Sequence, residues 1–130
     1  MVIDTSAILA IVLREPEAEA FARAIAKDTV RLMSTVSWLE TLLVVEGRHG
    51  PESSDDALLI LRDFEIQALP FDAEQMREAR HAWRRFGKGR HPAALNLGDC
   101  CSYALALTRS EPLLFKGGDF SRTDIPRAEW

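Results

Sequence analysis

Short apolar runs alternate with longer amphipathic stretches along the chain, and this pattern predicts strands and helices in turn. The apolar runs predict strands at Met1–Asp4, Arg31–Ser34, Ile66–Leu69 and Leu113–Phe115, with a further strand beginning near Ile125. Apolar residues spaced three and four apart predict helices at Thr5–Leu13, Glu17–Ala26, Val36–Arg48, Ser53–Phe64, Ala73–Phe86 and Gly98–Thr108. Such alternation is typical of an α/β fold, a parallel sheet of short strands covered by helices on both faces.

Two of the helix boundaries are marked by residues that favour helix ends. Gly47 and Gly50 are expected to end the helix that begins at Val36. The run Ser53–Asp56 is expected to cap the helix that follows, because Ser and Asp side chains accept hydrogen bonds from the first backbone amides.

Composition limits the class of protein. The chain has 130 residues, 47% hydrophobic and 28% charged, which predicts a single globular domain spanning residues 1–130. No apolar stretch approaches the roughly 20 residues that cross a bilayer, and no segment resembles a signal peptide. The only cysteines, Cys100 and Cys101, are adjacent, which suits a reducing compartment better than a disulfide framework. We therefore expect a cytoplasmic protein without a membrane partner.

Four acidic residues stand where the predicted fold has least need of an acid. Asp4 ends the first strand, and Glu40 interrupts the apolar run from Trp38 to Val45. Asp99 opens a mostly apolar helix, and Asp119 follows two glycines after the strand that ends at Phe115. Because the carboxyl ends of parallel strands meet at one edge of the sheet, Asp4 and Asp119 are expected to lie at the same rim.

Each acid also has a purely structural explanation, and the sequence leaves these alternatives open. Asp4 and Asp99 both stand at helix starts, where Asp caps well. Glu40 lies three residues after Ser37, the spacing of a capping box. Asp119 sits in a glycine-containing turn. Asn96, three residues before Asp99, is expected to hold that carboxylate or its loop by hydrogen bonds.

Gathered together, the four acids would place several negative charges in one volume, which requires a cation or protons to neutralise them. Oxygen ligands alone favour a hard cation such as Mg²⁺ or Mn²⁺ over zinc. The chain has no phosphate-binding glycine loop and no nucleophile elbow. A divalent cation without a nucleotide cradle suits attack by an activated water on a phosphodiester.

Basic residues concentrate in one segment although the net charge of the chain is -4. Between Arg77 and His91, the candidates for contacts with a polynucleotide backbone are Arg84, Arg85, Lys88 and Arg90. The alternative is that these side chains form an ordinary solvated helix face running into a loop.

The chain resembles the PIN-domain ribonucleases, and among them the toxin subunits of bacterial VapBC-type toxin–antitoxin pairs. The matching stretches are Met1–Ala7, Ser37–Thr41, Leu95–Ala106 and Pro112–Phe120. The first and third together are specific, whereas the second and fourth are weak alone. Relatives often have an acid where this chain has Gly118, which leaves the fourth acidic position to Asp119.

The resemblance implies a PIN-like three-layer α/β/α sandwich and a metal-dependent endoribonuclease toxin, with RNA as substrate and Mg²⁺ or Mn²⁺ as cofactor. It implies that Asp4, Glu40, Asp99 and Asp119 form the catalytic site, with Asp4, Asp99 and Asp119 holding the metal. Ser6 and Asn96 match the polar residues that support the first and third acids. The resemblance also implies a homodimer and a VapB-type antitoxin whose C-terminal segment occupies the active-site groove.

Two rival functions are weighed against the nuclease. A Mg²⁺ phosphohydrolase would need a second Asp two residues after Asp4, where Ser6 stands, and a phosphorelay receiver would need an acid pair at its first strand. A PIN-like module that holds RNA or a protein without cutting would have no need of all four acids.

Overall fold

The computed structural model describes residues 1–130. Four strands form one parallel sheet in the order β3-β2-β1-β4, with Val2 aligned with both Leu32 and Leu113. The strands are β1 (Val2–Ile3), β2 (Leu32–Ser34), β3 (Gln67–Leu69) and β4 (Leu113–Leu114). The predicted α/β class with a parallel central sheet is confirmed.

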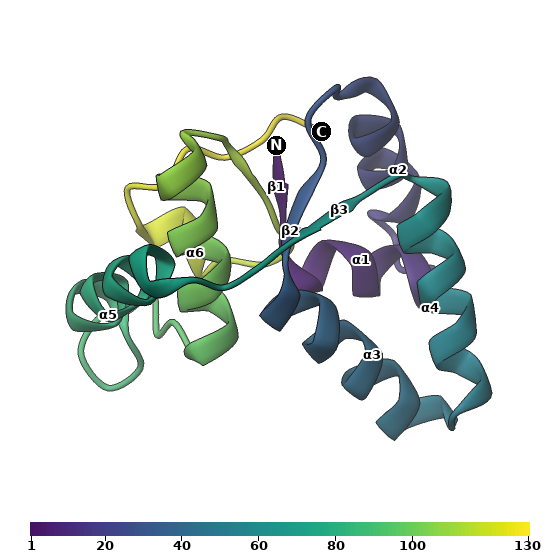
Figure 1. The fold of residues 1–130 in the computed structure, drawn as a ribbon, viewed down its shortest axis with the longest axis horizontal. Coiled ribbons are helices and arrows are strands. Elements are labelled where there is room, and N and C mark those ends of the chain that lie inside the picture. The colour runs from purple at the N-terminus through teal and green to yellow at the C-terminus, as the bar shows by residue number, and fades with distance from the viewer.

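Six α-helices cover the sheet on both faces. They are α1 (Thr5–Val12), α2 (Ala18–Lys27), α3 (Thr35–His49), α4 (Glu52–Asp63), α5 (Ala73–Phe86) and α6 (Leu97–Arg109). Figure 1 shows α5 and α6 on one side of the strands and α1 to α4 on the other. A short 3-10 helix, η1 (Phe120–Arg122), follows β4. None of the helices is long and apolar enough to pass through a membrane.

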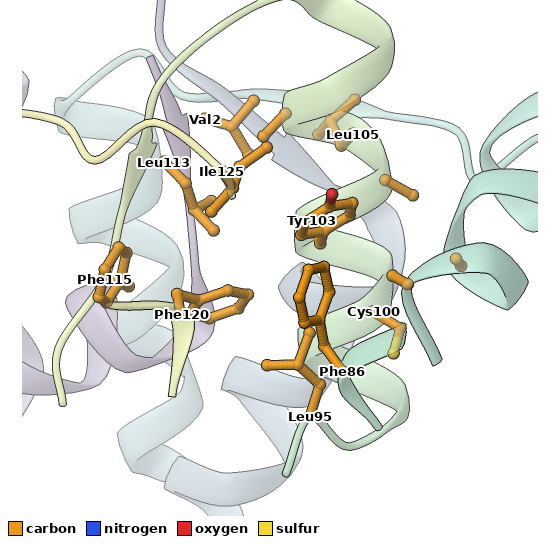
Figure 2. Packing of buried hydrophobic residues seen from close by; sticks show 14 of the residues in the cluster. Val2, Phe86, Leu95, Cys100, Tyr103, Leu105, Leu113, Phe115, Phe120 and Ile125 are labelled. Carbon is orange, nitrogen blue, oxygen red and sulfur yellow. The ribbon is translucent and has the colours of Figure 1, made fainter. Parts of the chain in front are cut away.

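Two hydrophobic cores lie on opposite faces of the sheet because successive strand residues point to opposite sides. Val2 and Leu113 face α5 and α6, whereas Ile3 and Leu114 face α1, α2 and α4. Figure 2 shows the first core, in which Phe115 and Phe120 lie beside one another. Their ring centroids are 5.0 Å apart.

Several predicted boundaries are corrected by the structure. The run Ser53–Asp56 does not cap α4, because the helix begins one residue earlier at Glu52 and Pro51 occupies the cap position without a side-chain hydrogen bond. Gly47 lies inside α3, and Gly50 ends it with a φ of 89°. The final strand expected near Ile125 is reduced to one isolated bridge between Leu113 and Arg127.

The strand order fixes where a ligand site forms. The chain moves from β1 outward to β2 and β3, and then returns to place β4 on the other side of β1. In open parallel sheets, ligands gather at the carboxyl ends of the strands where the order reverses. Here that point lies between β1 and β4, which are followed by Asp4 and by the loop carrying Asp119.

Candidate active site

Asp4 is anchored at the reversal point of the sheet. The residue is 4% exposed, and its Oδ2 accepts hydrogen bonds from the backbone N and the hydroxyl of Ser6, at 2.9 and 2.6 Å. The Ser6 hydroxyl in turn accepts a hydrogen bond from the backbone N of Lys116, at 3.0 Å. Asp4 therefore caps α1, as its structural explanation predicted. Through the Ser6 hydroxyl it is also linked to the segment that follows β4.

Glu40 does not form a capping box. Ser34 caps α3 and the helix begins at Thr35, so Glu40 lies in the second turn. Its carboxylate is partly buried, and its Oε2 accepts a hydrogen bond of 2.8 Å from the Thr5 hydroxyl. The structural explanation offered by the spacing from Ser37 is therefore wrong, and Glu40 faces α1 across the site.

Asp99 forms a reciprocal pair with Asn96 at the start of α6. The backbone N of Asp99 donates to Asn96 Oδ1 at 3.0 Å, and the backbone N of Asn96 donates to Asp99 Oδ2 at 2.7 Å. The predicted hydrogen bonding between these residues is confirmed. It fixes the Asp99 carboxylate at the mouth of the site.

The electrostatics of Asp99 reveal that the four acids are neighbours. Burial, together with the negative charges of Asp4, Asp119 and Glu40, raises the pKa of Asp99 to about 6, against a lowering effect of the hydrogen bond from the Asn96 backbone. The fold therefore places Asp4, Asp119 and Glu40 near enough to Asp99 for their negative charges to act on its carboxyl group.

Asp119 reaches the site on an exposed loop. It makes no side-chain capping hydrogen bond to η1, so the turn does not depend on its carboxylate. The next residue, Phe120, is 3% exposed and packs on Phe115. This apolar anchor, rather than the acid itself, fixes the path of the loop (Figure 2).

No Lys, Arg or His side chain forms an ion pair with any of the four acids. The carboxylates also do not converge on a single coordination position, since no three His, Cys, Asp or Glu side chains form a metal-binding cluster as they stand. Their oxygen-only chemistry and uncompensated charge nevertheless fit a hard divalent cation.

The family model of the PIN domain, which describes its characteristic sequence, matches residues 1–126 of the chain. The chain belongs to the PIN-domain family. The chain is 51% identical to Ribonuclease VapC of Mycolicibacterium smegmatis, over 96% of the chain and 97% of that protein. It is 50% identical to Ribonuclease VapC30 of Mycobacterium tuberculosis, over 96% of the chain and 95% of that protein. The resemblance inferred from the sequence motifs is confirmed.

Solved PIN-domain structures share the fold at low sequence identity. One is Mycobacterium tuberculosis VapC20, described as a Sarcin-Ricin loop cleaving toxin, with a TM-score of 0.78 and 19% identity over 95% of each chain. Another is VapBC2 of Rickettsia felis bound to a DNA fragment from its promoter, with a TM-score of 0.74 and 16% identity over 98% of this chain and 96% of that one. Both support the three-layer arrangement.

The basic candidates of this PIN domain are not equivalent. Arg84, Lys88 and Arg90 are exposed and have no ion-pair partner. Arg85 is paired with Asp124 at 2.8 Å, and that carboxylate also accepts a hydrogen bond of 2.6 Å from the Tyr103 hydroxyl. Arg85 is therefore committed to holding the C-terminal segment against α5.

Sequence reasoning missed two residues of the site, Thr5 and Gly98. Thr5 stands at a predicted helix start, and nothing nearby in sequence marks its contact with Glu40, 35 positions away. Gly98 carried a signal, because a glycine within the first turn of a helix costs stability and often marks a close approach.

An apolar groove adjoins the acids of this PIN domain. It has a volume of about 460 Å³ and runs between α3 and the start of α6. Its lining residues are Val36, Leu39, Glu40, Leu43, Val44, Asn96, Leu97 and Gly98. Leu39, Leu43 and Leu97 are all more than half exposed, at 56%, 60% and 73%. A wide apolar surface therefore leads directly to the Glu40 carboxylate.

Proposed function

We propose that this PIN domain is a Mg²⁺-dependent endoribonuclease, with Mn²⁺ able to substitute, and that it acts as the toxin of a VapBC-type pair. The observation that carries the proposal is the partly buried Asp99 carboxylate at the start of α6, which has no basic ion-pair partner and whose pKa is raised to about 6 by burial and by the charges of three other acids. Such a cluster destabilises the fold unless a cation or protons neutralise it, and perturbed carboxylates of this kind are typical of functional sites. The names of the relatives point to ribonuclease chemistry.

Asp4, Asp99 and Asp119 are the residues that would hold the metal. Ser6 fixes the Asp4 carboxylate through Oδ2, and the Asn96 backbone fixes Asp99 through Oδ2. In both acids the other carboxylate oxygen accepts no side-chain or backbone hydrogen bond, so it is available to a ligand. A bound divalent cation supplies positive charge that offsets the carboxylates and the phosphate under attack.

Glu40 is assigned a role in proton transfer. It lies on α3, and its carboxylate is oriented by the hydroxyl of Thr5, the residue that follows Asp4. A carboxylate held in this way can contact the cation or accept a proton from the attacking water. Arg84, Lys88 and Arg90 are proposed to contact the phosphates of the RNA on either side of the scissile bond.

We further propose that a VapB-type antitoxin segment lies in the groove between α3 and α6. An apolar segment would cover Leu39, Leu43 and Leu97, and a basic side chain at its end would reach the acids. Pairing that cation with the carboxylates would block the position of the metal. The domain is proposed to act in the cytoplasm, where RNA is present and where its two free cysteines stay reduced.

A homodimer is proposed as the assembly of this PIN domain. A second hollow, with a volume of about 400 Å³ between α5 and α6, has an almost entirely apolar lining that includes Met76, Trp83 and Leu97. All three side chains are exposed in the isolated chain, which is unfavourable in water. Sedimentation equilibrium tests the proposal: a single monomeric species at micromolar concentration contradicts it.

The function is tested by incubating the purified domain with structured RNA and Mg²⁺ or Mn²⁺. Cleavage should disappear with EDTA and in Asp99→Asn, and should persist in Asp56→Asn, which removes an exposed carboxylate on α4. Cleavage that survives both EDTA and Asp99→Asn contradicts the assignment. Mn²⁺ binding without cleavage of any RNA would instead favour a module that binds RNA or protein without cutting.

A further inference from the structure

Glu40 is the only one of the four acids whose carboxylate is held by residues outside the acidic set and its own neighbours in sequence. Thr5, on α1, donates a hydrogen bond of 2.8 Å to Oε2. Gly98, on α6, leaves the space in which both carboxylate oxygens lie. Three helices that are distant in sequence therefore meet at this one side chain.

The Thr5 hydroxyl has two acceptors within reach and one proton to donate. The carbonyl of Ser37 lies 3.2 Å away, but it already accepts a hydrogen bond from the Thr41 hydroxyl at 2.9 Å. The Glu40 carboxylate is closer and carries charge, and hydrogen bonds to ionised acceptors are about twice as strong as neutral ones. Thr5 is only 7% exposed, so water competes weakly for this proton.

Gly98 is required for space and not for an unusual backbone conformation. A Cβ atom built at this position would stand 2.5 Å from Glu40 Oε2 and 2.9 Å from Oε1. Glycine near the start of a helix costs up to about 1 kcal/mol relative to alanine. A methyl group at this position would therefore displace the carboxylate, which is the flexible end of the Glu40 side chain.

A buried hydrogen bond joins α3 and α6 beside the Glu40 side chain. The hydroxyls of Ser37 on α3 and Ser102 on α6 are 2.9 Å apart, and both residues are at most 1% exposed. This bond fixes the separation of α3 and α6 one turn below Gly98. The space for the Glu40 carboxylate is therefore set by rigid elements.

We propose that Thr5 and Gly98 are positioning residues that hold the Glu40 carboxylate against the first turn of α6, on the side of Asp99. Thr5 orients the carboxylate from one side, and the missing side chain at residue 98 admits it from the other. Neither residue contacts RNA or metal in this proposal. The consequence for catalysis rests on the proposed nuclease function, whereas the hydrogen bond itself does not.

The hydroxyl is tested by comparing Thr5→Val with Thr5→Ser. Val keeps the shape of Thr but cannot donate, so kcat for RNA cleavage should fall about 10- to 100-fold with little change in KM. Ser keeps the donor and should restore most of the rate. Equal losses in Val and Ser would overturn the proposal, because shape and not the hydrogen bond would then be responsible.

The space is tested by Gly98→Ala, which should stabilise an isolated helix but displace the Glu40 carboxylate here. Cleavage should fall to a similar extent as in Thr5→Val, and the double variant should lose little more, because both act through Glu40. Full activity in Gly98→Ala, with the domain folded, would overturn its role.

A measurement independent of cleavage separates this proposal from the nuclease function. Urea unfolding of wild type, Thr5→Val, Glu40→Ala and the double variant forms a double-mutant cycle. Non-additive shifts of the unfolding midpoint support the Thr5–Glu40 contact even if wild type cleaves no RNA, in which case only the nuclease assignment fails. Additive shifts would overturn the proposed positioning whatever the activity.

Discussion

Two groups of carboxylates flank the segment that follows β4, and only one of them has a cation of its own. On one side, Lys116 lies 2.8 Å from Glu15 and 2.9 Å from Glu17. On the other side, Asp99 faces three further acids with no Lys, Arg or His partner. The same short loop supplies the lysine to the first group and Asp119 to the second.

The two groups differ in the sign of their pKa shifts. The Lys116 ammonium beside Glu17 lowers the pKa of this acid, so its ionisation is favoured in the folded protein. Burial and neighbouring acids raise the pKa of Asp99 to about 6, so ionisation of this acid is opposed. A paired group of acids supports the fold, whereas an unpaired group weakens it and is retained for another purpose.

The largest expected effect follows from removing a charge of the unpaired group. Asp4→Asn and Asp99→Asn should each lower RNA cleavage by about 10³-fold, which corresponds to ~4 kcal/mol of transition-state stabilisation. Asn retains the shape and the hydrogen-bond acceptor of Asp, so the capping bonds to Ser6 and Asn96 survive. Single-turnover cleavage assays measure the effect, and circular dichroism checks the fold. Wild-type rates in both variants would remove these residues from the active site.

The next effect concerns metal binding and pH. Because metal ligands must be deprotonated, Mn²⁺ affinity should fall by up to about tenfold per pH unit below the pKa of Asp99, near 6. Titration of Mn²⁺ by electron paramagnetic resonance at a series of pH values measures this. Asp56→Asn should leave the profile unchanged, whereas Asp99→Asn should bind weakly at every pH. A pH-independent affinity between 5 and 7 contradicts the prediction.

A smaller effect is expected on stability, with opposite signs in the two groups. In EDTA at pH 7.5, Asp99→Asn should raise the free energy of unfolding by about 1 kcal/mol, or about 3–5 °C in Tm. Lys116→Met should lower Tm slightly, because it leaves Glu15 and Glu17 without their cation. Thermal unfolding followed by circular dichroism compares the two. A lower Tm in Asp99→Asn than in wild type would show that the charge of Asp99 does not destabilise the folded protein.

The stability gain of Asp99→Asn should itself depend on pH. The folded pKa of Asp99, about 6, lies above its ordinary value of 3.8, so the folded protein binds this proton more tightly than the unfolded chain does. The contribution of Asp99 to stability is therefore fully present below pH 3.8 and is lost as pH rises through 6. The difference in Tm between wild type and variant should vanish near pH 4.

The smallest effects are expected at the basic residues. Arg84→Gln and Lys88→Gln should each reduce the slope of log affinity for single-stranded RNA against log salt by about 0.7. Arg85→Gln should change the slope less, because Arg85 already pairs with Asp124. Fluorescence anisotropy with labelled RNA, in EDTA to prevent cleavage, provides the measurement. An equal change for Arg85 would mean that its ion pair opens on binding.

The sequence by itself determined the class of fold and the expected positions of two acids. Alternating short strands and amphipathic helices are local patterns, so they predict a parallel sheet without knowledge of its packing. Asp4 and Asp119 follow neighbouring parallel strands, so topology alone sends both to one rim, whereas Asp99 was assigned to the site by the resemblance of its motif. The hydrogen bonds between Asn96 and Asp99 span only three residues, so the sequence could predict them as well.

Only the tertiary structure decided which distant residues form hydrogen bonds at the site. Thr5 and Glu40 are 35 positions apart, Ser37 and Ser102 are 65 apart, and Ser6 and Lys116 are 110 apart. Such contacts depend on the rotation and separation of packed helices, which no local pattern encodes. The same packing assigned Arg85 to Asp124 and made room for a carboxylate at Gly98. Local propensity therefore selects the elements, whereas packing between distant segments determines the geometry of the site.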